Sequence, residues 1–227
     1  MSRTKLTKTI KYATVATDIV LVAVDNKQLK ILLIEMKRKP YTGLWAIPGG
    51  MVNPDESVDQ AAERHLANKT GLKNIYMEQL YTFGEVKRDP FGRVVSVAYL
   101  ALLPDISKLS IKTNSEYTAI AWHNINHLPK LGYDHKAIAK LAIERLRSKL
   151  AYTNIVYGLL PNEFTQADLQ KVYEIILGRG LDKRNFRKKI LSLGLIKPTG
   201  KNTLGEAHRP AKLYKFVSRE PRAIEIL

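Results

Sequence analysis

The chain has 227 residues, of which 45% are hydrophobic and 26% charged, and it contains no cysteine. This composition is typical of a folded protein with one large domain or two smaller ones, and the lack of cysteine excludes disulfide bonds and thiolate metal sites. The longest apolar run, residues 97–103, is too short to cross a membrane, and the basic N-terminus lacks the apolar stretch of a secretory signal. We therefore expect a cytoplasmic protein.

The formal net charge is +16, and much of the excess lies near the C-terminus. Residues 183–215 hold ten lysines and arginines against a single acid, Glu206. A general surplus of lysine is often only a solvated face, whereas a local concentration favours a surface that binds a polyanion such as nucleic acid.

The first 125 residues are dominated by patterns typical of strands, rich in valine, isoleucine, leucine and tyrosine. These patterns predict four strands, at residues 12–24, 29–36, 76–86 and 94–103. Between the second and third strands we expect a helix at residues 57–70, and after the fourth a helix at residues 135–150, because both segments space apolar residues along one face. Helices packed on a mixed sheet form an α+β unit.

After about residue 150, short helical patterns follow one another. We expect helices at residues 152–160, 166–177 and 183–193, with caps at Thr165 and Asp182 and a stop at Gly194. Two strand-like pieces follow, at residues 195–197 and 211–216. This order predicts a winged helix-turn-helix domain. We place the domain boundary at residues 148–152, which divides the chain into domains 1–149 and 150–227.

The segment 183–193 has the pattern of a helix that reads DNA. Phe186, Ile190 and Leu193 share its inner face, while the opposite face is basic and also carries Leu191. In a helix-turn-helix domain the last helix enters the major groove, where arginine can pair with guanine and lysine contacts phosphates. The expected DNA contacts are Lys183, Arg184, Asn185, Arg187, Lys188, Lys201, Arg209 and Lys212. The alternative is a basic helix that only faces solvent.

The stretch GGMVNPDESVDQAAERHLANKTGL at residues 49–72 carries a second pattern. Its fixed positions are Gly50, Glu56, Arg64, Leu66, Gly71 and Leu72. These match the spacing of the Nudix signature, G-x5-E-x7-R-E-U-x-E-E-x-G-U with U aliphatic, so the segment resembles the Nudix family. The resemblance implies an α/β/α sandwich and Mg²⁺-dependent hydrolysis of a nucleoside diphosphate linked to another group, with the metal held by glutamates of the R-E-U-x-E-E segment.

Three of those glutamates are replaced in this chain, by His65, Asn68 and Lys69. On a helix these positions share a face, and Mg²⁺ requires hard oxygen ligands that the three residues do not supply. We therefore expect no metal, no cofactor and no catalytic residue. Gly50, Glu56, Arg64 and Gly71 are expected to remain as scaffold, with Glu56 and Arg64 forming an ion pair between loop and helix.

A pocket without the metal carboxylates would still suit an anionic ligand, because backbone amides and positive charge remain. The residues expected to line it are Arg38, Trp45, Gly50, Lys69, Arg88 and Arg93. The alternatives are that the basic segments 37–40 and 88–96 are exposed turns and that Trp45 belongs to the core.

Residues 10–217 together resemble the Nudix-related transcriptional regulators of the NrtR type, since the segments 88–96 and 182–188 both look like that family. The resemblance implies a homodimer, a palindromic DNA operator, and an effector such as ADP-ribose or a sugar, in control of NAD-metabolism or sugar-utilisation genes. We expect a ligand-responsive repressor without hydrolase activity. Two alternatives are a Mg²⁺-dependent Nudix hydrolase with an added nucleic-acid-binding module, and a scaffold whose winged helix binds protein.

Overall fold

The larger sheet is organised around β1 (Thr14–Asp25), which pairs with β6 (Val94–Leu103) in parallel and with its other neighbours antiparallel. The computed structural model describes residues 12–109, 117–203, 210–224 and 226. The strand order is β3-β2-β1-β6-β5, with β4 on β1 and β7 on β2. The other strands are β2 (Gln28–Met36), β3 (Trp45–Ala46), β4 (Gly49–Met51), β5 (Tyr76–Phe83) and β7 (Tyr117–Asn124).

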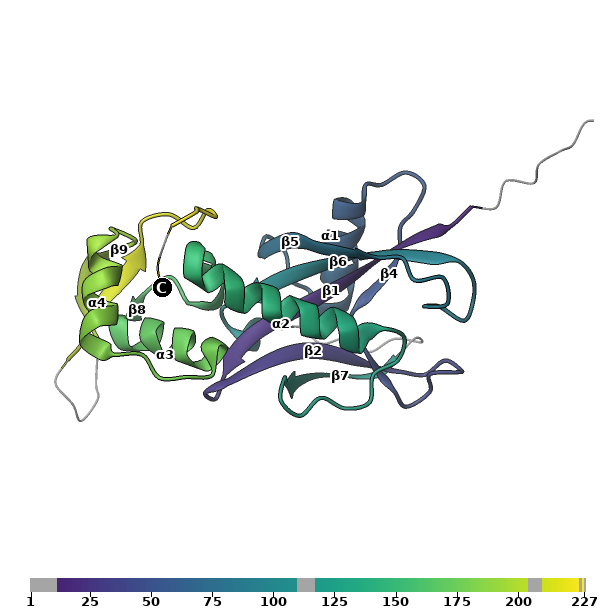
Figure 1. The fold of residues 1–227 in the computed structure, drawn as a ribbon, viewed down its shortest axis with the longest axis horizontal. Helices are drawn as coiled ribbons and strands as arrows, with labels where there is room; N and C mark the ends of the chain where they lie inside the picture. The colour runs from purple at the N-terminus through teal and green to yellow at the C-terminus, as the bar shows by residue number, and fades with distance from the viewer. Residues whose placement is uncertain (1–11, 110–116, 204–209, 225, 227) are drawn as a thin grey trace, which may run out of the picture.

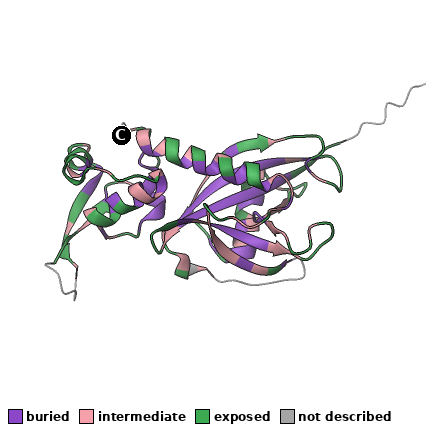
Figure 2. Cartoon of the chain, turned by 60° about the horizontal axis from the view of Figure 1, so that its bottom comes forward, coloured by how far each residue is buried: buried purple, intermediate pink, exposed green. Residues whose placement is uncertain are grey.

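Two helices cover the two faces of this sheet (Figure 1). Helix α1 (Val58–Thr70) packs on the face to which β1 presents Ile19 and Leu21, and α2 (His135–Tyr152) packs on the face with Val20 and Val22. Because both faces are covered, these strand residues are all fully buried, and Figure 2 shows the buried residues concentrated in the strands. The expected α/β/α sandwich is confirmed.

The helix starts follow from local sequence. Ser57 caps α1 by accepting a hydrogen bond from the Gln60 amide, and Gly71 ends the helix in the left-handed conformation with φ of 74°. Thr165 and Asp168 form the reciprocal pair expected at the start of α3 (Gln166–Leu177).

The expected helix at residues 152–160 is wrong. Helix α2 continues to Tyr152, Thr153 is extended, and only a short 3₁₀ turn, η2 (Ile155–Leu159), follows. The side chain of Asn154 explains the break, because it donates to the Glu220 carbonyl and accepts from the Arg222 amide. The C-terminal segment therefore binds where the helix would have to continue.

The remaining elements form the winged helix that the sequence predicts. Helix α3 is followed by α4 (Lys183–Ser192), and a three-stranded sheet has the order β8-β10-β9. Its strands are β8 (Phe164–Thr165), β9 (Ile196–Asn202) and β10 (Lys212–Phe216). A second 3₁₀ turn, η1 (Ile106–Lys108), follows β6. Within the part of the chain that the structure describes, no helix combines the length and apolar character needed to cross a membrane.

One hydrophobic core joins the two halves of the chain. It includes Leu146 and Leu150 of α2 together with Tyr173 and Ile176 of α3, and Figure 1 shows α2 running from the sheet toward α3. The guanidinium of Arg147 also donates from Nε to the Ile176 carbonyl at 2.9 Å. The division into domains 1–149 and 150–227 stays a prediction, and α2 passes through it without a linker.

A shared core makes the two halves unfold together. Leu169 of α3 is 1% exposed, so Leu169→Ala is expected to lower the free energy of unfolding by about 2–5 kcal/mol. The only tryptophans, Trp45 and Trp122, lie in the larger sheet, so their fluorescence reports on the first half. In urea titrations the tryptophan midpoint should fall together with the far-ultraviolet circular dichroism midpoint.

The control is Leu191→Ala, since Leu191 is 48% exposed on α4 and should leave both midpoints nearly unchanged. An unchanged tryptophan midpoint in Leu169→Ala, with an earlier separate circular dichroism transition, would contradict the shared core.

Candidate functional site

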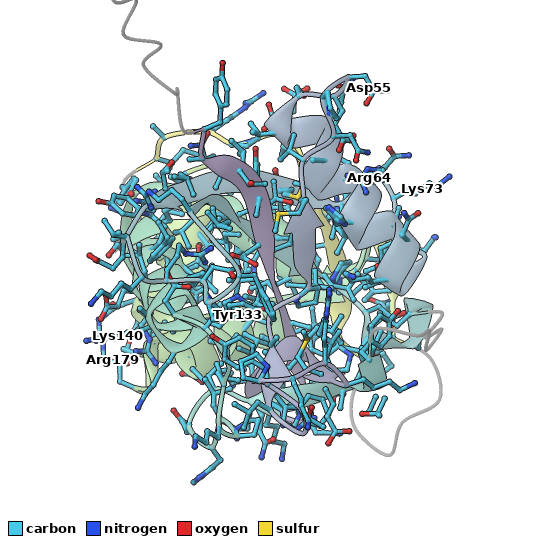
Figure 3. The ribbon with its side chains drawn as sticks, turned by 90° about the vertical axis from the view of Figure 1, so that its right-hand side faces the viewer. Asp55, Arg64, Lys73, Tyr133, Lys140 and Arg179 are labelled. Atoms are coloured by element: carbon cyan, nitrogen blue, oxygen red, sulfur yellow. The ribbon has the colours of Figure 1, made fainter. Side chains whose placement is uncertain are left out.

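A cavity of about 620 Å³ lies at one end of the larger sheet. Of the residues expected to line it, Arg38, Gly50, Lys69 and Arg88 do so. They come from four separate places: the segment after β2, strand β4, the last turn of α1, and the β5–β6 loop. Figure 3 looks at this end of the molecule, with Tyr133, another lining residue, near the centre of the view.

Arg88 is held in the wall of the cavity by two carboxylates. Its side chain is only 3% exposed and donates to both oxygens of Asp134, at 2.9 and 2.7 Å, and to Asp18 at 3.2 Å. These bonds tie the β5–β6 loop to β1 and to the residue that precedes α2. Burying a charge is costly unless it is paired and hydrogen-bonded, and this geometry satisfies both conditions.

The pairing also fixes the charge of Asp18. Burial alone would raise its pKa, but contacts with the His135 ring, the hydrogen bond from Ser96 at 2.6 Å and the nearby Arg88 lower the pKa to about 2. The carboxylate is therefore ionised throughout the neutral range. It forms a fixed negative charge behind the Arg88 guanidinium.

His135, the first residue of α2, connects the same cluster to the loop before β4. The Ile47 amide donates to its Nδ1 at 2.9 Å, which places the proton of the neutral ring on Nε2, facing Asp18 Oδ1 at 3.4 Å. The Tyr133 ring stacks on the His135 ring with centroids 5.0 Å apart. Sequence reasoning missed Asp18, Tyr133 and His135, because nothing in the local sequence places residues so far apart at one site.

Two further cations border the cavity, each near an aromatic ring. The Arg38 guanidinium lies 5.5 Å from the centre of the exposed Phe91 ring, and the Lys69 ammonium lies 5.4 Å from the centre of the Tyr117 ring. Lys69 is 8% exposed, so its charge sits in a largely desolvated position. Electrostatic attraction to an anion is stronger at such a position than at the surface.

Two residues expected at the site are not among those that line the cavity. Trp45 is half-buried against the edge of the His123 ring, with centroids 4.3 Å apart, which agrees with the core alternative. Arg93 is exposed and donates to the backbone carbonyls of Glu85 and Val94, so it braces its own loop. Basic character alone did not distinguish it from Arg88.

The Glu56–Arg64 ion pair expected from the signature is present. Arg64 donates to both oxygens of Glu56 and to the Met51 carbonyl, and Glu56 accepts from the Asn53 amide. Hydrogen bonds from Arg64 and Asn53 lower the pKa of Glu56 to about 2. Both residues thus fix the loop before α1 to the helix.

The three residues that replace the glutamates do not converge on one point. His65 is directed at the loop, with Nε2 2.9 Å from the Met51 carbonyl, and burial lowers its pKa. A Cβ on Gly50 would come within 2.3 Å of the His65 ring, so a larger residue there would require the ring to move. Asn68 is exposed, and Lys69 alone lines the cavity. Of the three positions expected to share a face, only position 69 therefore contributes to the cavity lining.

No group of three or more histidine, cysteine, aspartate or glutamate side chains is placed to hold a metal ion in the described ranges. Asp59 is instead bonded to the Tyr99 hydroxyl. Asp59 and Glu63 face a different cavity, of about 760 Å³, between α1 and β5. The residues of the signature segment do not fit a Mg²⁺ ion.

The winged helix presents a second candidate surface. On α4, Phe186 and Ile190 are buried, with the Phe186 ring 5.1 Å from that of Tyr173. The helix residues expected at DNA that are exposed are Lys183, Arg184, Asn185 and Lys188. Arg187 is only half-exposed, and its Nε is buried without a partner in the described structure. Its expected contact with DNA stays a prediction.

The hairpin after α4 continues this surface. Lys201 on β9 and Lys212 on β10 are exposed, and Lys201 pairs with Glu163 at 2.9 Å. Arg209, also expected at DNA, lies outside the described residues. The described part of the hairpin therefore adds two of the three basic residues expected from it.

Comparison with known proteins identifies both halves. The NUDIX domain family matches residues 15–143, and the NrtR DNA-binding winged helix domain matches residues 156–216. An ADPR responsive transcriptional repressor, NtrR, from Acinetobacter baylyi is 36% identical over 217 residues, which cover 92% of this chain and 86% of that protein.

Solved structures show the same relationship. Shewanella oneidensis NrtR complexed with a 27mer DNA superposes with a TM-score of 0.79 at 34% identity, over 89% of this chain and 93% of that one. The NUDIX domain of the same protein, complexed with ADP ribose, superposes with a TM-score of 0.56 at 34% identity, over 62% of this chain and 92% of that one.

The Asp18 carboxylate should give the protein an acid-sensitive stability. The pKa of Asp18 is about 2 in the folded protein, compared with an ordinary value of 3.8. Its contribution to the free energy of unfolding is therefore fully present above about pH 4 and is lost as the pH falls toward 2. Asp18→Asn is expected to reduce the free energy of unfolding by about 2 kcal/mol at pH 7, with the difference from the natural protein shrinking below pH 4. Urea titrations between pH 7 and 2.5 measure this.

Asp55→Asn, at an exposed acid before α1, serves as the control and should match the natural protein at every pH. A deficit of Asp18→Asn that stays constant from pH 7 to 2.5 would show that the charge of Asp18 contributes nothing.

Proposed function

We propose, on the premise that this chain belongs to the NrtR-type family of Nudix-related transcriptional regulators, that it is a repressor whose DNA affinity changes when ADP-ribose binds. The proposal rests on one observation. A cavity lined by cations and the exposed basic helix α4 are both built on elements that share one hydrophobic core. The DNA target is a palindrome read by a homodimer, as the family resemblance implies. Genes of NAD metabolism are the expected targets.

The DNA contacts follow from the exposed side of α4 and the hairpin. Lys183, Arg184 and Asn185 form the first turn of α4, the part of a recognition helix that reaches base edges. Lys188, Lys201 and Lys212 are assigned to phosphates, which position the protein without reading sequence. Arg209 is assigned to the same role by sequence alone.

ADP-ribose fits the cavity better than a neutral sugar does. The lining holds four cations, Lys37, Arg38, Lys69 and Arg88, against the two acids Asp18 and Asp89. This excess of positive charge in the lining attracts a diphosphate electrostatically, whereas a neutral sugar gains nothing from it. The relative from Acinetobacter baylyi is named as responsive to ADPR, which supports the same choice.

Lys69 takes the part that a metal ion plays in hydrolases of this fold. Bound Mg²⁺ would neutralise the diphosphate and assist attack by water, but a lysine ammonium only neutralises charge. With His65 bonded to the loop and Asn68 exposed, the segment offers no cluster of oxygen ligands. We therefore propose that the chain binds the diphosphate and does not cleave it.

The α4 assignment predicts two different mutational effects on DNA binding. Arg184→Ala should weaken operator affinity by about 1–3 kcal/mol and relax base preference at one position. Lys188→Ala should weaken binding to all sequences and reduce the salt slope by about one, because one phosphate contact is lost. Fluorescence anisotropy with DNA selected by the protein from a random pool measures both.

Lys140→Ala is the control, since Lys140 is exposed on α2 and paired with Glu144. Unchanged affinity and salt slope in both α4 variants would remove this helix from the interface. Salt-insensitive binding would favour a protein partner.

The role of Lys69 predicts effector binding that is independent of metal. Calorimetric titration with ADP-ribose should give the same affinity in EDTA as in Mg²⁺. Lys69→Met keeps the length of the side chain and removes its charge, so affinity should fall by about tenfold, roughly 1.4 kcal/mol. Lys73→Met, at an exposed lysine just beyond α1, is the matched control.

The same samples distinguish the hydrolase alternative. The natural protein should leave ADP-ribose intact in Mg²⁺, and the triple change His65→Glu, Asn68→Glu, Lys69→Glu tests whether carboxylates restore turnover. Robust hydrolysis by the natural protein, or binding that requires Mg²⁺, would overturn the proposed sensor role.

A further inference from the structure

Asp134 stands at the start of α2 but does not cap it. Aspartate at this position usually accepts a hydrogen bond from a free amide of the first turn, yet the Asp134 side chain makes no such bond. Both of its oxygens instead accept from Arg88, at 2.9 and 2.7 Å. The carboxylate thus has two alternative partners, and in this structure it is committed to the arginine.

Of the Arg88–Asp134 ion pair, only the arginine reaches the cavity. Arg88 lines the cavity whereas Asp134 is not among its lining residues. Nη2 of Arg88 is shared between Asp134 and Asp18, while Nη1 makes no hydrogen bond within the described residues. One guanidinium therefore faces two carboxylates, and an anion entering the cavity competes with both for its donors. Repulsion between that anion and the Asp134 carboxylate acts in the same direction.

Asp134 directly precedes α2, and α2 contacts the winged helix near its other end. Near its other end, α2 donates from Arg147 to the Ile176 carbonyl of α3 and buries Leu146 and Leu150 in the shared core. Tyr173 of α3 in turn packs on Phe186 of α4. Packed side chains and one hydrogen bond therefore connect α2, through α3, to the surface assigned to DNA.

We propose that Asp134 is the positioning residue through which a ligand in the cavity alters the winged helix. In the arrangement that the structure shows, Asp134 holds Arg88, and the first turn of α2 has no side-chain cap. An anionic ligand draws Arg88 to itself, and the released carboxylate turns to the amides of α2. This inference rests on the proposed function and adds the residue that couples its two sites.

The test measures coupling rather than binding. Operator affinity is determined by fluorescence anisotropy with and without saturating ADP-ribose, and the ratio of the two dissociation constants is the coupling factor. For the natural protein we expect a factor within the range of about 5–150 that is usual for allosteric proteins. Asp134→Asn keeps the shape of the side chain and removes its charge, so the factor should fall to less than a third of the natural value.

Glu144→Gln is the matched control, an exposed acid on the same helix, and should keep the natural factor. Asp134→Ala removes the capping acceptor as well and should bring the factor close to one. Hydrogen exchange gives a second readout at Lys136, because the backbone amides of residues 135, 137 and 138 already donate to carbonyls. ADP-ribose should slow exchange of the Lys136 amide in the natural protein but not in Asp134→Ala. A purely structural role for Asp134 would change stability without changing these ligand-dependent differences.

The outcomes separate this inference from the proposed function. If the natural protein binds neither DNA nor ADP-ribose, or binds both without coupling, the proposed function fails. If the natural protein is coupled and Asp134→Asn keeps its factor within twofold, the inference alone is overturned. Loss of ADP-ribose binding in Asp134→Asn would also overturn it, because Asp134 would then act only by holding Arg88.

Discussion

The buried face of α2 is the constraint on which the rest of the molecule depends. Leu146 and Leu150 pack in the same core as the larger sheet and α3, so the ligand-sized cavity and the basic helix α4 cannot be placed independently. The first residue of α2, His135, lies in the cavity wall, and the last turns support the winged helix. A single helix thereby joins the cavity proposed for a small anion to the surface proposed for DNA. Ligand control of DNA binding requires this kind of physical connection.

Under the proposed function, charge explains how a Nudix fold can bind a diphosphate without metal. In Nudix enzymes carboxylates attract metal ions, and the metal ions neutralise the diphosphate. Here Lys69 places a positive charge directly in the cavity, and the buried Arg88 adds another that is balanced by Asp18 and Asp134. The Glu56–Arg64 pair and the close approach of Gly50 to the His65 ring hold the loop before α1 in place. Function follows the site and not the fold.

Sequence patterns predicted the elements that bury a regular apolar face, such as α1, α3, β1 and β6, because periodicity reports burial directly. They missed β3, β4, β7 and β8: β7 alternates weakly, and the other three are too short for a pattern. The helix at residues 152–160 failed because the partner that breaks it, the segment bonded to Asn154, is far along the chain. The residues of the cavity could be predicted only in part, because some of their partners are far away in the sequence. Arg88 could be proposed from its charge, but Asp18 and Asp134 become its partners only through the fold.

The central claim is that this chain senses a diphosphate without metal and responds by changing its hold on DNA. The most direct measurement is operator affinity in EDTA, with and without ADP-ribose, followed by recovery of the nucleotide. We expect operator affinity to differ with and without ADP-ribose in EDTA, and the ADP-ribose to be recovered intact. An affinity that changes only when Mg²⁺ is added, with the nucleotide consumed, would contradict it.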